Sequence, residues 1–174
     1  MFQALIMIGA LLVGVYLLGQ AAGGVNQMFS GGLGNTAVED ANFISTHIKS
    51  IYGGSINGAT NFSTVGNAEA IRAGAVPSDM LNGDGQTIKA PWVGSTVQLT
   101  GSSDGGTFYE TWSQVPGSAC ASLANAQSVN YMNINGTAIN MGAGQNVASQ
   151  VAQACNGTAG NYSSVQLSYV MNFS

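Results

Sequence analysis

Charged side chains are scarce in this sequence. Only 6% of the 174 residues are charged, and the formal net charge is −4. The three basic residues, Lys49, Arg72 and Lys89, are far apart. Because a nucleic-acid surface needs clustered Lys and Arg to displace counterions, this composition argues against direct binding of DNA or RNA. Gly, Asn, Ser and Thr supply the polarity instead, which suits an extracellular protein that packs against copies of itself.

Side chains for catalysis are also few. His47 is the only histidine, and no serine or cysteine motif lies near it to form a Ser-His-Asp arrangement. Two distant cysteines and one histidine do not make a zinc site. Three aspartates, Asp79, Asp84 and Asp104, fall in turn-like stretches, where Asp is a common turn former. We therefore predict that the protein is not an enzyme and has no cofactor or metal site.

Cysteine occurs only twice, as Cys120 and Cys155. An even number of cysteines behind an export-type segment predicts one disulfide. Closing a loop of about 36 residues would stabilise the fold by roughly 4 kcal/mol on the chain-entropy estimate. Two separate buried thiols are the alternative.

Residues 1–22 contain no charged side chain, and the first charge in the sequence is Glu39. Roughly 20 apolar residues at about 1.5 Å each span a bilayer core of about 30 Å, so we predict an apolar membrane helix here. A secretory signal peptide would place Lys or Arg before its apolar run, and none occurs here. We expect a retained helix whose leader was removed before Met1; a signal peptide and an ordinary membrane anchor are the alternatives.

Two pairs of small residues lie four positions apart in this region, Ala10 with Gly14 and Gly19 with Gly23. Such pairs let helices approach closely, although small residues are common in membrane helices in general. The pattern favours self-association of the apolar helix. We predict that these four residues, together with Leu5, pack in the core of the assembly.

The next two stretches predict an interruption and a second helix. Residues 23–35 are rich in Gly, which costs about 1 kcal/mol in a helix interior, so we expect a melted, extended segment. A helix is predicted over residues 36–54, because Thr36 and Glu39 fit a capping box and Gly53-Gly54 is a stop signal. Its apolar residues recur at spacings of four and three, giving one stripe of Ala37, Ala41, Ile44, Ile48 and Ile51.

Residues 55–174 are predicted to form a globular head with one disulfide. Strands are expected at 96–100, 107–112 and 129–134, and short helices at 67–75, after Pro116 and at 145–154. The last ten residues alternate, with Val165, Leu167, Tyr169, Met171 and Phe173 on one face. The predicted fold class is therefore α+β: a long N-terminal helical spine, interrupted by the Gly-rich stretch and packed against a C-terminal antiparallel sheet.

Several short motifs occur along the chain in an order that resembles a known family. They are Ile51-Tyr52-Gly53, residues 70–80 (AIRAGAVPSDM), residues 90–94 (APWVG), Val115-Pro116 followed by residues 119–123 (ACASL), and Ala154-Cys155. Each motif is weak alone, but their order and spacing resemble the type IV pilins of the b class, and among them the PilS-like major pilins. The resemblance covers nearly the whole chain.

This resemblance implies a structural subunit of an extracellular pilus. In such a subunit a prepilin peptidase exposes Met1, which becomes N-methylated, and Cys120 pairs with Cys155. The unassembled subunit sits in the inner membrane, and the pilus assembly machinery stacks copies of it into a helical filament for mating-pair contact (conjugation) or adhesion to a recipient or host cell. One departure stands out: most type IV pilins carry Glu at the fifth mature position, where this chain has Leu5. Some pilins of conjugative plasmids lack this Glu, which favours a thin conjugative pilus.

Two other functions are consistent with parts of the sequence. A secretion-system pseudopilin would share the apolar helix, but pseudopilins often bind calcium and lack a C-terminal disulfide loop. A secreted binding domain would lose residues 1–22 as a removable signal segment.

Overall fold

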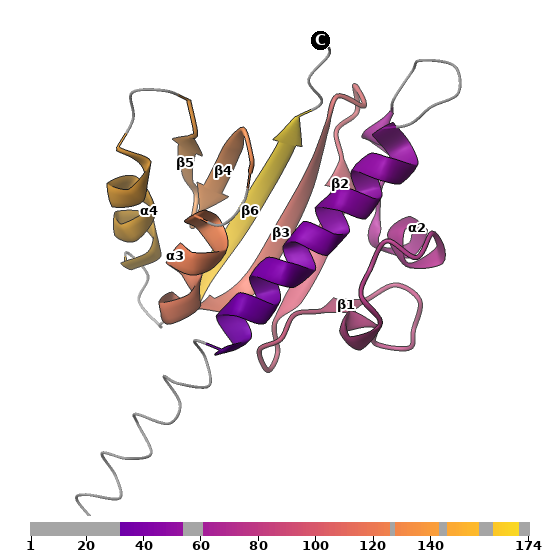
Figure 1. Cartoon of the computed structure of the whole chain (residues 1–174), viewed down its shortest axis with the longest axis horizontal. Coiled ribbons are helices and arrows are strands. Elements are labelled where there is room, and N and C mark those ends of the chain that lie inside the picture. The colour runs from indigo at the N-terminus through magenta and orange to yellow at the C-terminus, as the bar shows by residue number, and fades with distance from the viewer. Residues whose placement is uncertain (1–31, 54–60, 126–127, 143–145, 157–161, 171–174) are drawn as a thin grey trace, which may run out of the picture.

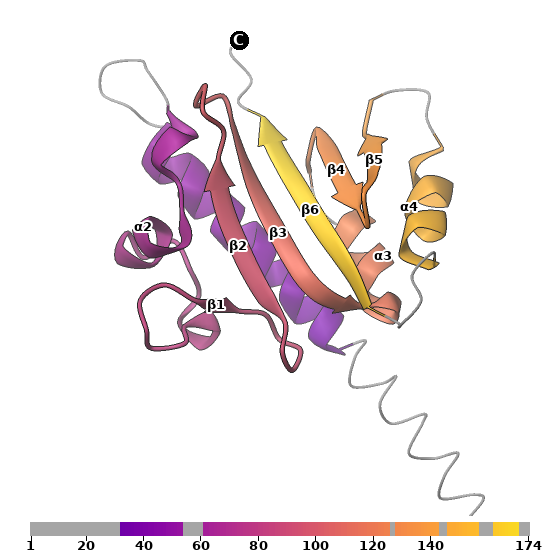
Figure 2. The same ribbon diagram turned by 180° about the vertical axis from the view of Figure 1, so that it is seen from behind.

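The computed structural model describes residues 32–53, 61–125, 128–142, 146–156 and 162–170. Within these ranges the chain forms a six-stranded antiparallel sheet with helices on one face (Figure 1). A helix over residues 32–53, called the spine helix below, crosses this face diagonally, while no described helix covers the opposite face (Figure 2). A long N-terminal helix on an antiparallel sheet confirms the predicted α+β class.

The other elements follow in chain order. They are η1 (Phe62–Thr64), α2 (Asn67–Arg72), η2 (Ser78–Met80), β1 (Ile88–Lys89), β2 (Thr96–Gly101), β3 (Thr107–Pro116), α3 (Gly117–Asn125), β4 (Tyr131–Ile134), β5 (Thr137–Asn140), α4 (Val147–Asn156) and β6 (Tyr162–Val170). The strands lie in the order β1-β2-β3-β6-β4-β5. The last strand of the sequence therefore lies in the middle of the sheet.

The spine helix buries the predicted apolar stripe. Ala37, Ala41, Ile44 and Ile48 are each 0% exposed and belong to the single core that the sheet also lines. Ile51, predicted in the same stripe, is 44% exposed, so this part of the prediction is wrong. Ile51 lies at the margin of the stripe and in the last described turn, where the core covers only part of it.

The predicted helix boundary at Thr36 is also wrong. Residues 32–35 are already helical, and the Thr36 hydroxyl donates to the Gly32 carbonyl at 3.4 Å instead of capping a helix end. Gly34 is buried, and a Cβ built on it would lie 3.4 Å from the Cβ of Ala119 in α3. Packing of this turn thus outweighs the low helix propensity of Gly. The rest of the predicted interruption, residues 23–31, lies outside the described residues.

The sheet has one apolar and one polar face. Val165, Leu167 and Tyr169 of β6 are buried as the alternation predicted, while Met171 and Phe173 lie outside the described residues. Cross-strand pairing places Leu167 between Glu110 of β3 and Met132 of β4 on the inner face. A strand with apolar residues on one side only packs that side on a core, and here the spine helix covers it.

The sequence missed the two edge strands and the bulge. β1 and β5 have only two and four residues, too short for a period-two pattern. β3 extends to Pro116 because its register shifts between Trp112 and Val115, where Gln114 has a positive φ of 50°. Such a bulge bends the strand. In the described part of the chain no helix is both long and apolar enough to span a membrane; the predicted membrane helix, residues 1–22, falls outside that part.

Gly101 tests how tightly η1 packs on β2. A Cβ built on Gly101 would lie 1.6 Å from the Phe62 carbonyl oxygen. We expect Gly101→Ala to lower the free energy of unfolding by roughly 3 kcal/mol, because backbone must move to admit the methyl group. The control is Gly32→Ala, which has nothing within 4 Å and should change stability by at most about 1 kcal/mol. Urea unfolding measures both, and equal values would contradict the packing described.

Candidate functional site

The segment between the two cysteines forms one edge of the sheet. It carries α3, β4, β5 and α4, and the Cys120–Cys155 disulfide joins α3 to the end of α4 with a Cα–Cα distance of 5.8 Å. Cys120 is 0% and Cys155 5% exposed, so the bridge lies in the core. The predicted pairing is therefore present, and no free cysteine remains.

Asn135 is the polar centre of this edge. Asn135 and Gly136 form the two-residue turn between β4 and β5, with φ values of 54° and 85°. The Asn135 side-chain amide donates to the Ala154 carbonyl at 2.9 Å and to the Ser163 hydroxyl at 3.2 Å, and its side-chain oxygen accepts from the Ser164 amide at 2.8 Å. One side chain thus ties the hairpin to α4 and to β6. An Asn-Gly pair is the usual sequence signal for such a turn, but neither this turn nor the role of Asn135 was predicted.

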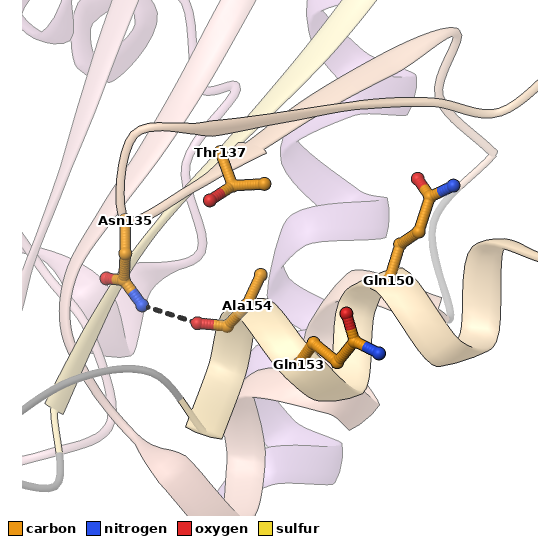
Figure 3. A pocket seen from close by; sticks show the side chains of 5 residues that line it. All are labelled: Asn135, Thr137, Gln150, Gln153 and Ala154. Atoms are coloured by element: carbon orange, nitrogen blue, oxygen red, sulfur yellow. Dashed lines mark hydrogen bonds between the residues drawn. The ribbon is translucent and has the colours of Figure 1, made fainter.

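A groove opens beside this turn. It has a volume of about 340 Å³ and is lined by Asn135, Thr137, Gln150, Gln153 and Ala154. In Figure 3, Thr137 at the start of β5 and the two glutamines of α4 border the same gap. All five side chains are uncharged, so the groove can offer hydrogen bonds but no ionic contact.

A buried acid lies under the spine helix. Glu110 of β3 is 0% exposed; its Oε2 accepts from the Trp112 indole at 3.4 Å, and its Oε1 has no hydrogen-bond partner. Burial raises the pKa of Glu110 well above its usual range, and the Trp112 hydrogen bond and the Lys49 charge offset this only in part. Glu110 alternates with Phe108 and Trp112, so its inward direction was readable from the sequence.

Lys49 and Tyr169 connect this acid to the spine helix. The Lys49 ammonium lies 4.7 Å from the centre of the Tyr169 ring, which stacks on Phe108 at 4.7 Å. Burial lowers the pKa of Lys49, whereas the Glu110 charge raises it. Burial, with Glu110 adding to it, raises the pKa of Tyr169 well above 10. Lys49, Tyr169, Phe108 and Glu110 thus connect the C-terminal part of the spine helix to the sheet.

A second acid is buried near the other end of the spine helix. Asp40 is 7% exposed, and its Oδ2 has no hydrogen-bond partner. Burial, with the charges of Asp79 and Glu39, raises the pKa of Asp40 to about 6. Asp40, Asp79 and Lys89 line one pocket. Among the described residues no group of three or more His, Cys, Asp or Glu side chains could hold a metal ion.

The remaining predicted positions divide into two groups. His47 lies on the spine helix, with its ring stacked on Phe43 at 3.8 Å and its Nδ1 2.9 Å from the Phe43 carbonyl oxygen. The positions predicted for methylation and core packing lie outside the described residues; they are Met1, Leu5, Ala10, Gly14, Gly19 and Gly23.

Comparison with known proteins assigns the family. Residues 34–169 match the family model described as PilS N terminal, which spans both the spine helix and the sheet. The chain belongs to this family. No curated protein matches the sequence.

Two solved structures share the fold. The crystal structure of type IV b pilin from Salmonella typhi matches with a TM-score of 0.58 and 20% identity, covering 79% of this PilS-family chain and 99% of that chain. TcpA, a type IV pilin from Vibrio cholerae El Tor biotype, matches with a TM-score of 0.53 and 15% identity, covering 78% and 98%. The fold is thus that of these two pilins.

Asn135 should contribute strongly to the stability of this edge. Asn135→Ala removes three hydrogen bonds and places Ala at a positive φ, so we expect a loss of roughly 3 kcal/mol in the free energy of unfolding. Asn135→Gly removes the same bonds but tolerates the backbone conformation, and should lose about 1 kcal/mol less. Urea unfolding of both variants separates the two contributions. A loss below about 1 kcal/mol for both would contradict the role given to this side chain.

Asp40 should make stability depend on pH. Its pKa in the folded state, about 6, is above the ordinary value of 3.8, so the folded protein loses stability as pH rises from 4 to 6. Asp40→Asn cannot ionise, and should raise the free energy of unfolding at pH 7 by about 1 kcal/mol, with no gain near pH 3.5.

The control for this experiment is Asp79→Asn. It removes the neighbouring charge but not the burial of Asp40, which is the larger cause of the shift. We expect a smaller gain at pH 7 than for Asp40→Asn, measured by urea unfolding at several pH values. An Asp40→Asn gain that is the same at pH 3.5 and pH 7 would contradict ionisation as its cause.

Proposed function

We propose that this chain is the major subunit of a type IV pilus and polymerises through its apolar N-terminal helix. The observation that carries the proposal is the PilS family match, which runs through the spine helix and all six strands. The sequence adds a 22-residue segment without charge directly before the Gly-rich stretch. A head with that fold behind such a segment fits a filament with apolar helices in its core and heads outside.

The spine helix supports this arrangement because its two faces differ. One face packs into the head, whereas Phe43 is 38% and Ile51 44% exposed on the helix. These exposed apolar side chains are available to neighbouring copies once the helix lines up with others. Around 20 apolar residues in each copy would add to assembly at roughly 25 cal/mol per Å² of buried apolar surface.

The proposal includes the life cycle of the subunit. Residues 1–22 hold the unassembled chain in the inner membrane as a transmembrane helix, and a prepilin peptidase exposes Met1 for N-methylation. The assembly machinery then moves the helix from lipid into the filament, where Leu5, Ala10, Gly14, Gly19 and Gly23 pack against other copies. The extracellular pilus makes contact with a recipient or host cell during mating or adhesion. An uncharged core helix with Leu5 in place of an acid fits a thin conjugative pilus.

The small residues of the core helix test this proposal. We expect Gly14→Leu to reduce filament formation at least tenfold, because a large side chain keeps the helices apart. Ala10→Gly keeps the position small and should still form filaments. Electron microscopy of cells that express the chain with its assembly machinery gives the filament count, and intact-mass analysis tests for a methylated Met1.

Formation of the Cys120–Cys155 disulfide in every variant shows that the head has folded. Folded wild-type protein that makes no filaments with its machinery would refute the proposed function. Filaments of Gly14→Leu as abundant as those of the wild type would refute only the packing of the core.

A further inference from the structure

β5 is an open edge of the sheet. Among the described strands, in the order β1-β2-β3-β6-β4-β5, β1 and β5 are the two at the edges. β1 has two residues, its Ile88 already pairs with Leu81 in an isolated bridge, and it carries the charged Lys89. β5 has four residues without charge or proline, and Thr137, Ala138 and Asn140 are exposed. Charge, proline and coverage are the usual protections of an edge strand, and β5 lacks the first two.

The pairing with β4 shows which backbone groups of β5 face outward. Ile134 and Thr137 flank the two-residue turn, so they form a hydrogen-bonded pair. The Met141 amide donates to the Asn130 carbonyl at 3.1 Å, four residues further along, which fits the same alternation. The pairs Asn133↔Ala138 and Tyr131↔Asn140 are therefore the non-hydrogen-bonded ones. The N–H and C=O groups of Ala138 and Asn140 point away from the sheet.

The surroundings of this edge are uncharged and are bonded to neighbouring elements. Asn135 fixes the start of β5 to α4 and β6, and the disulfide fixes α4 to α3. The groove between β5 and α4 is lined only by uncharged side chains (Figure 3). The outward row of two N–H and two C=O groups, at Ala138 and Asn140, matches the hydrogen-bonding pattern of an extended polypeptide.

We propose that β5 pairs with an extended, uncharged backbone segment of a second copy of this chain, which adds a seventh strand to the sheet. This inference rests on the proposed function. A second copy fits because a neutral edge suits a chain with only 6% charged residues. In a filament the contact is heterologous, because β5 of one copy meets a different segment of the next, and such a contact repeats without closing.

Hydrogen exchange tests the pairing directly. We expect the amides of Ala138 and Asn140 to exchange at least about tenfold more slowly in wild-type filaments than in the detergent-solubilised subunit. The amide of Ile139 is an internal control, because it bonds to β4 in both states. Equal exchange of Ala138 and Asn140 in both states would overturn the proposal, as would protection that appears only after a receptor protein is added to the filaments.

A proline variant provides a second measurement. Ala138→Pro removes one outward N–H without breaking the β4–β5 ladder, and should reduce filament yield or filament melting temperature. Ala138→Val keeps the N–H and should behave as the wild type. If Ala138→Pro does not form the Cys120–Cys155 disulfide, the exchange measurement decides alone. Wild-type filaments with unprotected β5 amides would refute this pairing and leave the pilus function standing, whereas wild-type protein without filaments would refute that function.

Discussion

The packing of the spine helix on the inner face of the sheet is the contact on which the rest of the described structure depends. The inner face carries large apolar side chains such as Phe108, Trp112 and Leu167, all 0% exposed. Without the helix these side chains would face water, which would cost roughly 25 cal/mol of free energy per Å² of exposed apolar surface. The helix can lie close to the sheet because its stripe includes the small residues Ala37 and Ala41, and Gly34 lets the same helix approach Ala119 of α3. The head therefore packs on one face of the spine helix and depends on it for its core.

Two ionisable groups are buried at this same contact, and they make it sensitive to protonation. The pKa of Glu110 and that of Asp40 are both raised by burial. A carboxyl whose pKa is raised by folding carries a free-energy penalty that grows as pH rises from the unfolded-state pKa to the folded-state pKa. The positive charge of Lys49, a residue of the spine helix, favours the ionised carboxylate and so reduces this penalty for Glu110. Docking of the helix thus supplies both the burial that penalises the acid and the cation that partly compensates it.

The sequence predicted the parts of the fold that have a strong local period. The stripe from Ala37 to Ile48 and the alternation of Val165, Leu167 and Tyr169 were both correct, since each element buries one face along its whole length. The predicted start of the spine helix was wrong because Gly propensity and a capping pattern are local signals, whereas the contact of Gly34 with Ala119 joins distant parts of the chain. β1 and β5 were missed because short strands take their structure from neighbours.

The candidate site was less predictable than the fold. The cysteine count predicted the disulfide, but the three roles of the Asn135 side chain depend on partners 19, 28 and 29 residues away. The local pattern did not mark Asp40 as buried, although it lies well inside the spine helix and against the core. Polar residues whose partners come from distant elements leave no period in the sequence.

The scarcity of charge now has a structural interpretation. Among the described residues the one ion pair joins Glu69 and Arg72 at 2.6 Å within α2, where it is exposed. Links between elements are instead made by the disulfide, by Asn135 and by Asn67, whose side chain donates to the Val97 carbonyl and accepts from the Leu99 amide. Salt screens ionic contacts between exposed groups but not covalent bonds or neutral hydrogen bonds. A head built in this way keeps its stability as ionic strength changes, which suits the proposed function as a pilus subunit.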